Sequence, residues 1–250
     1  MTIKVAVLGA KGRMGSQACD AIKSAADLEL VAQIDLGDSL ELLRQSGAQV
    51  AVDFTHPDSV MSNLEFSIKN GIHVVVGTTG FDETKLNLLN NLLAHNPKVG
   101  ALIAPNFGLG AVLMMQFAAK AAPYFDSVEI IELHHPAKAD APSGTATRTA
   151  ELITEARRDF GSTTMPDATT SALEGARGAR VGDVPIHSIR LRGLVAHQEV
   201  VLGGLGETLT IRHDSLDRAG FMPGVLLGIR NVVNHPGLTF GLEHYMNLNA

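Results

Sequence analysis

Apolar residues in the first hundred positions gather in short continuous runs, separated by stretches with helical spacing. The runs are "IKVAVLG" (3–9), "LELVAQID" (28–35), "VAVDFT" (50–55), "HVVVGTTG" (73–80) and "VGALIAPNF" (99–107). Most are rich in β-branched residues without polar alternation, which is typical of parallel strands buried on both faces. Helical spacing occurs between them in "SVMSNLEFSIKNG" (59–71) and "ETKLNLLNNLLAH" (83–95). This alternation predicts a doubly wound α/β sheet.

The second part of the chain combines helices with another group of strands. The predicted helices are 108–125, 143–161 and 220–237, and the predicted strands are 127–135, 186–193, 196–204 and 207–214. Residues 161–185 have little periodicity, and we expect a long loop there. Ile189, Arg190 and Leu191 alternate apolar with charged positions, which predicts a mainly antiparallel sheet with one wetter face. That face could be solvated or could contact another subunit. The last helix is apolar enough to pack back onto the first domain.

Composition excludes several classes of protein. The chain has 250 residues, 45% hydrophobic and 18% charged, which suits one large or two modest globular domains. The net charge of −6 argues against nucleic acid as a main partner. Cys19 is the one cysteine, so an internal disulfide is impossible and we expect a cytoplasmic protein. No apolar run reaches membrane-spanning length, and we see no signal-peptide layout.

A glycine loop follows the first strand and opens a helix. Gly9, Gly12 and Gly15 have the spacing G-x-x-G-x-x-G. Glycine permits a close approach of a diphosphate to backbone N–H groups, and the helix N-terminus adds partial positive charge. Alone, the motif could be an ordinary strand-to-helix turn. Asp35 ends the second strand 20 residues after Gly15, where a carboxylate can bind an adenosine ribose, so we predict a dinucleotide site.

The residues around this loop point to both nicotinamide cofactors. Asp35 favours NADH, because its charge would repel the 2′-phosphate of NADPH, and Leu36 beside it adds no cation. Lys11 and Arg13, however, can attract that phosphate. We therefore expect use of NADH and NADPH, with NADPH losing more affinity as salt rises.

Two later strand ends are further candidates for cofactor contacts. These segments are "GTTG" (77–80) and "APNFG" (104–108). Ligands of open α/β sheets bind beyond the carboxyl ends of the strands, and small or amide residues suit a ribose and a nicotinamide. The alternative is that both segments are simply turns with good capping residues.

The segment "HHPAKADAPSGTA" (134–146) places reactive side chains just before a predicted helix. Ser143, Gly144 and Thr145 stand at the helix start, where backbone N–H groups lack partners within the helix and can bind a carboxylate. We expect the N–H groups of Gly144 and Thr145 to point outward unpaired, and the hydroxyls of Ser143 and Thr145 to add donors. Lys138 can pair with an anion or donate a proton.

The adjacent histidines extend this cluster. His134 and His135 stand at a strand end, where neighbouring side chains point to opposite faces, so we expect them to have different tasks. A metal site is disfavoured, because adjacent histidines rarely ligate one ion and Asp140 is the only nearby carboxylate. The plain alternative is a turn with satisfied polar groups. Together with the glycine loop, the cluster predicts a nicotinamide-dependent oxidoreductase acting on a small carboxylate.

These motifs resemble the dihydrodipicolinate reductase family, whose members serve lysine and diaminopimelate biosynthesis. The resemblance runs nearly end to end and includes "GAKGRMG", "VDFTHPDSVMSNLEF", "VVVGTTGF", "APNF" and "GETLTIRHDSLDR" besides the histidine segment. It implies a Rossmann-type domain (1–108 and 218–250) and a substrate-binding, oligomerising domain (109–217). It also implies a homotetramer that reduces a cyclic unsaturated dicarboxylate with NAD(P)H to tetrahydrodipicolinate.

The resemblance also implies roles for individual residues. His134 resembles the proton donor/acceptor, Lys138 resembles a proton donor, and the residues leave open which of them delivers the proton. His135, Gly144 and Thr145 resemble substrate ligands. The implied cofactor contacts are Gly9, Ala10, Lys11, Gly12, Arg13, Met14, Asp35, Gly77, Thr78, Thr79, Ala104, Pro105, Asn106 and Phe107. Some family members carry Arg after the acidic residue, where this chain has Leu36, so a strong NADPH preference is not expected.

Two other functions are compatible with the glycine loop. One is a different two-domain NAD(P)-dependent dehydrogenase of a small carboxylate, which would lack the histidine–lysine cluster. The other is a non-catalytic NAD(H)-sensing protein, which would leave that cluster without a task.

Overall fold

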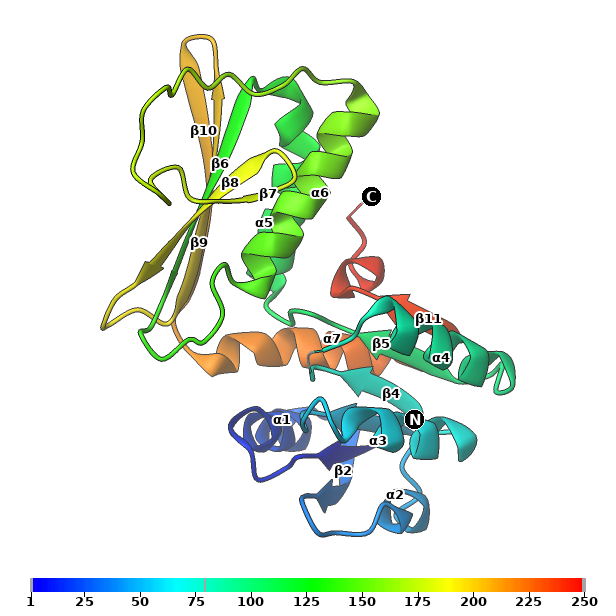
Figure 1. Ribbon diagram of the computed structural model, residues 1–250. Coiled ribbons are helices and arrows are strands. Elements are labelled where there is room, and N and C mark those ends of the chain that lie inside the picture. Colours follow the sequence, from blue (N-terminus) through cyan, green and yellow to red (C-terminus); the bar gives the residue numbers. More distant parts are fainter. Residues whose placement is uncertain (1, 79, 249–250) are drawn as a thin grey trace. The chain divides into compact units, whose positions relative to one another are not determined.

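The computed structural model describes residues 2–78 and 80–248, and these form two compact units. Unit 1 comprises Met1–Gly108 and Arg218–Ala250, and unit 2 comprises Leu109–Asp217 (Figure 1). Among the described residues, no helix is both long and apolar enough to cross a membrane. Each unit has its own sheet and is described separately.

Unit 1 is built on a six-stranded sheet in the order β11-β5-β4-β3-β1-β2, and every neighbouring pair is parallel. Its strands are β1 (Ile3–Leu8), β2 (Leu28–Ile34), β3 (Val50–Asp53), β4 (His73–Val76), β5 (Gly100–Ile103) and β11 (Gly237–Phe240). Its helices are α1 (Arg13–Ser24), α2 (Glu41–Gln45), α3 (Val60–Lys69), α4 (Glu83–Ala94) and α7 (Met222–Val232), with short turns η2 (Arg218–Phe221) and η3 (Leu242–Tyr245). The predicted doubly wound parallel sheet is confirmed.

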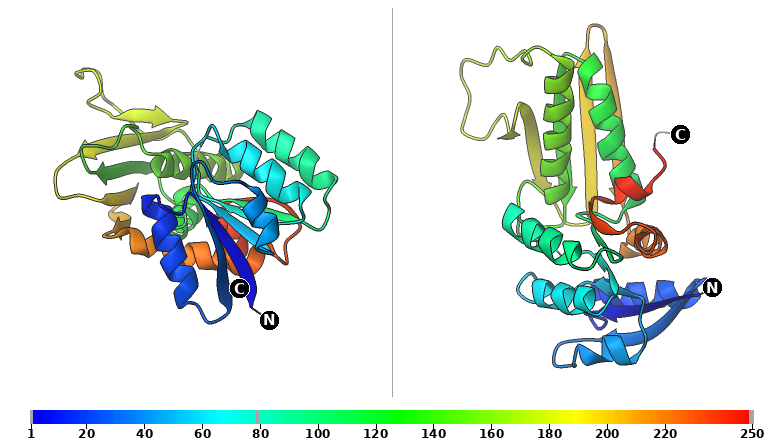
Figure 2. Two further views of the ribbon diagram at one scale, coloured as in Figure 1. Left: turned by 90° about the horizontal axis from the view of Figure 1, so that it is seen from below. Right: turned by 90° about the vertical axis from the view of Figure 1, so that its right-hand side faces the viewer.

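The strands of unit 1 have the burial that their continuous apolar runs predict. All four residues of β3 and of β5 are buried, as are the last four of β1. Helices α1 and α7 pack together, as do α3 and α4, and the two pairs cover opposite faces of the sheet (Figure 2). The carboxyl ends of the parallel strands therefore lie at one edge, where the glycine loop begins.

The C-terminal part of unit 1 differs from the prediction of a single helix over 220–237. Helix α7 ends at Val232, and the chain returns as the edge strand β11, which pairs with β5. Four residues of intermediate burial have too little pattern to identify a strand in the sequence. The short helix α2 escaped prediction for the same reason.

Unit 2 is a five-stranded mixed sheet in the order β10-β9-β6-β8-β7. Its strands are β6 (Ser127–His134), β7 (Ala179–Val181), β8 (Val184–Arg190), β9 (Ala196–Gly204) and β10 (Glu207–Ser215), and its helices are α5 (Leu109–Ala121), η1 (Ala122–Tyr124) and α6 (Gly144–Phe160). Strand β6 is antiparallel to β9 and parallel to β8. Helices α5 and α6 pack against each other on one face of this sheet (Figure 2).

Two expectations about unit 2 need correction. The predicted loop 161–185 is shorter, because β7 forms and β8 begins within it. The arginine of the Ile189-Arg190-Leu191 alternation also does not lie on the wetter face. Ile189 and Leu191 are 40% and 58% exposed, whereas Arg190 turns to the helix-covered side and pairs with the buried Glu132. The buried Glu132, rather than the alternation of apolar residues, therefore determines which side chains of β8 lie on the helix-covered face of the sheet.

Candidate functional site

The glycine loop of unit 1 is shaped by close backbone packing. Gly9 has φ +74°, and a Cβ there would lie 2.6 Å from the carbonyl oxygen of Phe54. A Cβ at Gly15 would collide with the carbonyl oxygen of Gly9. A side chain is therefore excluded at Gly9, in the turn after β1, and at Gly15, in the first turn of α1. Gly12 precedes α1 without providing a side-chain cap, so the first N–H groups of α1 are suited to an anion.

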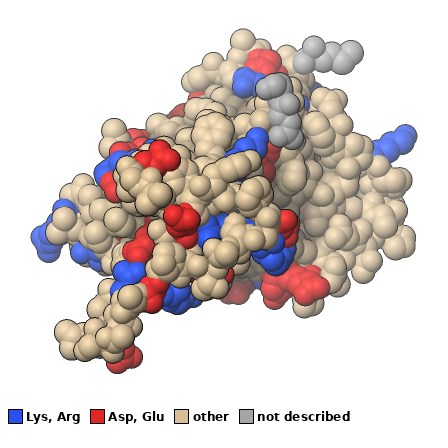
Figure 3. Space-filling view, turned by 90° about the horizontal axis from the view of Figure 1, so that it is seen from above, with Lys and Arg blue, Asp and Glu red and all other residues tan. Residues whose placement is uncertain are grey.

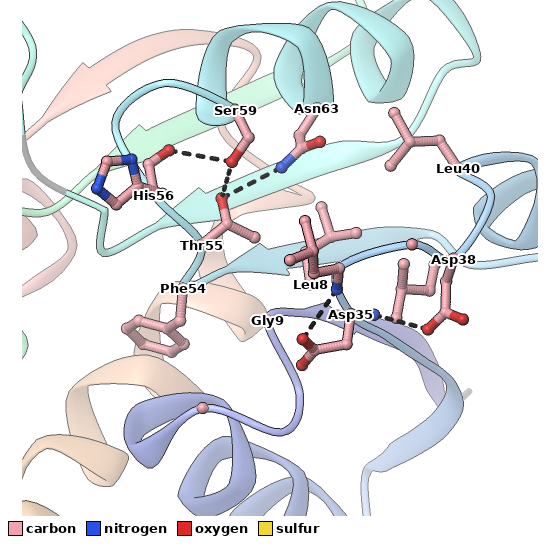
Figure 4. Close-up of a pocket in the computed structure, with 14 residues that line it drawn as sticks. Leu8, Gly9, Asp35, Asp38, Leu40, Phe54, Thr55, His56, Ser59 and Asn63 are labelled. Carbon is pink, nitrogen blue, oxygen red and sulfur yellow. Dashed lines mark hydrogen bonds between the residues drawn. The ribbon is translucent and has the colours of Figure 1, made fainter.

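Two adjoining cavities follow this loop along the carboxyl edge of the sheet. The first, of about 400 Å³, extends from the loop to the end of β2 and the start of α3 (Figure 4). The second, of about 290 Å³, is lined by residues that include Arg13, Met14, Gly77 and Thr78. Both cavities include Gly12, Phe54 and Thr55 in their walls, and we refer to the two together as the groove of unit 1, with Asp35 in the wall of the first. An extended dinucleotide fits such a groove.

Asp35 is held at the end of this groove. Its carboxylate accepts hydrogen bonds from the backbone N–H of Lys11 at 2.6 Å and of Leu36 at 2.8 Å. These two bonds lower the pKa of Asp35, so the side chain is an anion that can accept ribose hydroxyls. Asp38, which the sequence reading overlooked, accepts a bond from the N–H of Asp35 and adds a second carboxylate to the cavity wall.

A buried acid connects the ends of β3 and β4. Asp53 is 1% exposed, and its carboxylate accepts bonds from the hydroxyls of Thr55 and Thr78 and from the amide of Asn63. This network fixes Thr78 in the wall of the second cavity. The pattern of a single acid at the end of an apolar strand is the signal by which sequence reasoning could have found Asp53.

The remaining predicted cofactor residues have varied positions. Ala10, Ala104 and Phe107 are buried, and Phe107 packs edge-on against Phe54 at a ring distance of 5.8 Å. Lys11 is exposed. The predicted residues outside the walls of the two cavities are Ala10, Lys11, Ala104, Pro105, Asn106 and Phe107. Thr79 lies outside the described residues.

In unit 2, the start of α6 carries the predicted carboxylate site. Ser143 caps the helix, and its hydroxyl accepts a bond from the N–H of Ala146. Ser143 is only 2% exposed, so it acts here as a cap, and its role as a substrate ligand stays a prediction. Gly144 is exposed, and a Cβ there would meet nothing within 4 Å. The first turn of α6 is therefore open to an approaching ligand.

The expectation that the N–H of Gly144 is unpaired is wrong. The carboxylate of Asp140 accepts bonds from the ammonium of Lys138, at 2.7 Å, and from the backbone N–H of Gly144. Burial raises the pKa of Asp140, but these bonds outweigh it, and the pKa lies below its usual range. An acidic side chain is drawn to a helix N-terminus and to a neighbouring cation. Asp140 shows that this corner binds a carboxylate.

His134 stands beside this corner, at the end of β6. Its Nδ1 lies 2.5 Å from the carboxylate of Glu132. This carboxylate is fully buried and also accepts hydrogen bonds from both terminal nitrogens of Arg190. His134 is 13% exposed at its side chain, whereas His135 is exposed outside the strand. The two histidines thus have different surroundings, as expected. Sequence reasoning missed Glu132 and the inward turn of Arg190.

The electrostatics of His134 combine opposing effects. Burial lowers the pKa of His134, and the facing carboxylate of Glu132 offsets this only in part. Burial raises the pKa of Glu132, but hydrogen bonds from Arg190, Ser188 and His134 outweigh it, so the pKa lies below its usual range. At neutral pH, a carboxylate therefore faces a neutral imidazole.

The arrangement of charged and metal-ligating side chains can be described for the same residues. Within residues 2–78 and 80–248, no group of three His, Cys, Asp or Glu side chains is arranged to hold a metal ion. On the face shown in Figure 3, Lys and Arg side chains are interspersed with Asp and Glu side chains rather than forming a continuous basic area.

Comparisons with known proteins bear on both units. Two family models match, "Dihydrodipicolinate reductase, N-terminus" over residues 3–107 and "Dihydrodipicolinate reductase, C-terminus" over residues 110–246. The 4-hydroxy-tetrahydrodipicolinate reductase of Streptomyces avermitilis is 63% identical over 247 residues, 99% of each chain. The reductase of the same name from Nocardia farcinica is 60% identical over 248 residues, 99% of this chain and 100% of the relative.

Solved structures are similar over nearly the whole chain. The dipicolinate-bound dihydrodipicolinate reductase from Paenisporosarcina sp. TG-14 has a TM-score of 0.87 at 40% identity, covering 98% of this chain and 99% of that one. The amine dehydrogenase from Mycobacterium smegmatis has a TM-score of 0.64 at 14% identity, covering 96% of this chain and 95% of that one. The second likeness reflects the fold alone.

Proposed function

This chain belongs to the dihydrodipicolinate reductase family, and from that premise we propose how its own residues perform the reaction. The chain is an NAD(P)H-dependent oxidoreductase that reduces the dihydrodipicolinate ring in lysine biosynthesis. The observation that carries the residue assignment is the corner of unit 2 where Glu132 binds both His134 and the N–H of Ser143 at the start of α6, and where Asp140 binds Lys138. The substrate class is a small carboxylate like dipicolinate.

The groove of unit 1 suits a nicotinamide dinucleotide. The uncapped start of α1 would hold the diphosphate, and the anionic Asp35 would bind the adenosine ribose. Thr78, held by Asp53, would lie nearer the nicotinamide end of the groove. When bound, the reduced cofactor supplies the hydride for the ring. The remaining tasks, which are binding, orientation and proton supply, fall to residues of the protein.

The corner of unit 2 suits one carboxylate of the substrate. Lys138 offers an ammonium, and Gly144 and Thr145 offer the backbone N–H groups of the first turn of α6. Asp140 already uses the Lys138 ammonium and the Gly144 N–H, so a substrate carboxylate has to share or replace it. We assign substrate binding to this exchange.

Proton supply completes the reduction. Hydride addition to a conjugated imine leaves an electron-rich enamine, which gains one proton at carbon to give tetrahydrodipicolinate. Lys138 is one candidate donor, through the ammonium group that pairs with Asp140. His134 can donate only after binding a proton, because burial lowers its pKa. The two groups therefore have separable roles, and the pH dependence of turnover distinguishes them.

The surroundings of Asp35 favour use of both cofactors. Asp35 and Asp38 would repel a 2′-phosphate, whereas Lys11, whose backbone N–H bonds Asp35, and Arg13 would attract it. We predict that NADPH loses more affinity than NADH between about 50 and 200 mM salt, because its extra phosphate interacts with exposed cations. Fluorescence titration of each cofactor measures this. Equal salt dependence of the two dissociation constants would contradict the assignment of Lys11 and Arg13.

The uncovered face of the unit 2 sheet suits self-association. Helices α5 and α6 cover one face, and the opposite face carries the half-buried Ile131 and Leu133 beside the exposed Ile189. Apolar side chains on an uncovered sheet favour contact with another sheet. We propose a homotetramer built through this face, and a cytoplasmic location in keeping with the single buried thiol of Cys19.

The direct test follows NADH oxidation with substrate generated enzymatically. We expect turnover, and we expect pyridine-2,6-dicarboxylate to inhibit in competition with substrate, because the flat ring and its two carboxylates resemble the substrate. Cofactor binding without turnover would point to the NAD(H)-sensing alternative. Turnover of other small carboxylates, but not of this ring, would point to a different dehydrogenase.

A further inference from the structure

We propose that Glu132 is a positioning residue, which holds His134 with a proton on Nδ1 and its Nε2 free toward the substrate corner. This inference rests on the proposed function, because it assigns a task within the same reaction. Glu132 lies on β6, two residues before His134, and its carboxylate oxygen approaches Nδ1 to 2.5 Å. The same strand therefore carries the histidine and the acid that orients it.

The burial of Glu132 needs an explanation beyond stability. Its side chain is fully buried, on the helix-covered face of a strand whose other inward residues include Val128 and Ile130. Burying a charge costs several kcal/mol, and an apolar side chain of similar volume would stabilise such a site as well or better. A carboxylate retained at this place is therefore expected to serve a function. Its partners, Arg190 and His134, indicate which one.

The hydrogen-bond inventory determines the tautomer of His134. Arg190 donates to Glu132 through both terminal nitrogens, at 2.9 and 2.8 Å, which keeps Glu132 ionised and an acceptor only. Nδ1 of His134 must then be the donor in its contact with Glu132. A neutral imidazole with a proton on Nδ1 has its lone pair on Nε2. Nε2 can bind a proton and release it without any turn of the ring.

Glu132 also connects His134 with the carboxylate corner. Its second oxygen accepts a bond from the backbone N–H of Ser143, the residue that caps α6, at 3.3 Å. Arg190 extends the connection by donating to the carbonyl oxygen of Asp140 at 2.7 Å. One buried carboxylate thus fixes both the histidine ring and the start of the helix that binds the substrate carboxylate. The spacing between proton carrier and carboxylate site follows from this arrangement.

The charges around His134 predict a direction for each substitution. The groups that act on its pKa are Glu132 on the same strand, Arg190 on β8 and Lys138 in the following loop. Glu132 raises the pKa, whereas Arg190 and Lys138 lower it. Loss of the Glu132 charge must therefore move the titration of His134 to lower pH. Loss of the Arg190 charge must move it to higher pH.

The test compares pH profiles of kcat/KM for the full-length enzyme and Glu132→Gln. The amide group of glutamine can donate a hydrogen bond to Nδ1. This favours the opposite tautomer, in which the proton is on Nε2 and the lone pair is on Nδ1. We expect kcat/KM to fall by about 10²-fold. We also expect the limb that reports His134 to move down by about one pH unit. Assignment of that limb comes from His134→Gln, in which it should be absent.

Two further variants distinguish positioning from general damage. Arg190→Gln should move the same limb upward, and opposite shifts cannot arise from loosened packing. Glu155→Gln is the control, because Glu155 lies on α6 of the same unit, in the helix layer rather than on the uncovered sheet face, and pairs with Arg158 at exposed positions. Its profile should superimpose on that of the wild type. Thermal unfolding and pyridine-2,6-dicarboxylate binding identify any variant that fails to fold.

The outcomes separate this inference from the proposed function. If the wild type oxidises no NADH with the generated substrate, the proposed function fails. If the wild type turns over but Glu132→Gln folds and keeps the wild-type profile, only the positioning role is overturned. If Glu132→Gln fails to fold, Arg190→Gln alone decides, since an unshifted or lowered limb in that variant overturns the role.

Discussion

The residues to which we assign roles in unit 2 have charged neighbours. Lys138 holds its ammonium 2.7 Å from Asp140, so a carboxylate is already accommodated at the corner that we assign to the substrate. His134 and Lys138 were identifiable from the sequence, since two histidines and a lysine before a helix start are unusual. Glu132 was not, because its importance depends on Arg190, which is 58 residues away in the chain. Its one local signal is an acid in register with the buried Val128 and Ile130.

At this scale, Lys138→Ala tests the substrate corner. The change removes the cation to which we assign carboxylate binding and which is one candidate for proton supply, so we expect turnover to fall by about 10²-fold or more. Steady-state kinetics with NADH measures it. Lys120→Ala is the control, because Lys120 is an exposed lysine of the same unit in the last turn of α5. Near-normal turnover of Lys138→Ala would remove this residue from the mechanism.

Helices and strands were predictable from the sequence where the hydrophobic pattern was long or where clear boundary residues flanked it. Helix α6 begins after the cap Ser143 and ends at Gly161, which has φ +78°, and both boundaries are apparent in the sequence. Continuous β-branched runs identified the first five parallel strands. The strands β7 and β11 have three and four residues, so tertiary pairing rather than local pattern defines them. The cofactor groove was predicted at the glycine loop, at Asp35 and at Gly77 and Thr78, whereas Asp38 and Phe54 join it through the fold.

Helix α6 offers a prediction about stability. Arg157 is 5% exposed and donates to the carbonyl oxygens of Ala122, Phe125, Asp126 and Thr163. Arg157→Met would leave these acceptors without their donor, so we expect the free energy of unfolding to fall by about 3 kcal/mol. Urea denaturation measures the loss. Arg158→Met, at an exposed neighbouring position, should change it by less than about 0.5 kcal/mol.

The chain forms two compact units, and we assign cofactor binding to unit 1 and substrate binding to unit 2. Unit 1 is discontinuous, because α7 and β11 return from the C-terminal end to complete its sheet. The fold class was predictable, because strand and helix periods alternate throughout the first part. The alternation in β8 predicted a sheet with one wetter face, and the pair of Arg190 with the buried Glu132 places that charged side chain on the helix-covered face. A hydrophobic pattern in the sequence predicts burial only on average, and a specific ion pair in the fold can override it.

The response of the molecule to acid follows from two carboxylates of unit 2. Hydrogen bonds from Arg212 lower the pKa of Asp214, and hydrogen bonds from Thr169 lower that of Asp167, each from 3.8 to about 2. A carboxyl group whose pKa is lower in the folded than in the unfolded state stabilises the folded protein at pH values above its unfolded pKa. That contribution is lost as the pH falls through the folded pKa. We therefore expect unfolding midpoints in urea to drop between about pH 4 and pH 2.

Asp214→Asn supplies the comparison for this prediction. Asparagine does not titrate, so the midpoint should depend less steeply on pH over the same interval. Glu174→Gln, at an exposed position of the loop before β7, should leave the steepness unchanged. An equally steep curve for Asp214→Asn would show that other groups control the acid response.

The central claim is that the start of α6 and Lys138 hold a substrate carboxylate, while the start of α1 holds the cofactor diphosphate. The most direct measurement is a crystal structure of the protein with NADH and pyridine-2,6-dicarboxylate bound. We predict one carboxylate of the ligand within hydrogen-bond distance of Lys138 Nζ and of the N–H groups of Gly144 and Thr145, and the diphosphate at Gly12. A dicarboxylate bound away from Lys138 and Gly144 would contradict the account.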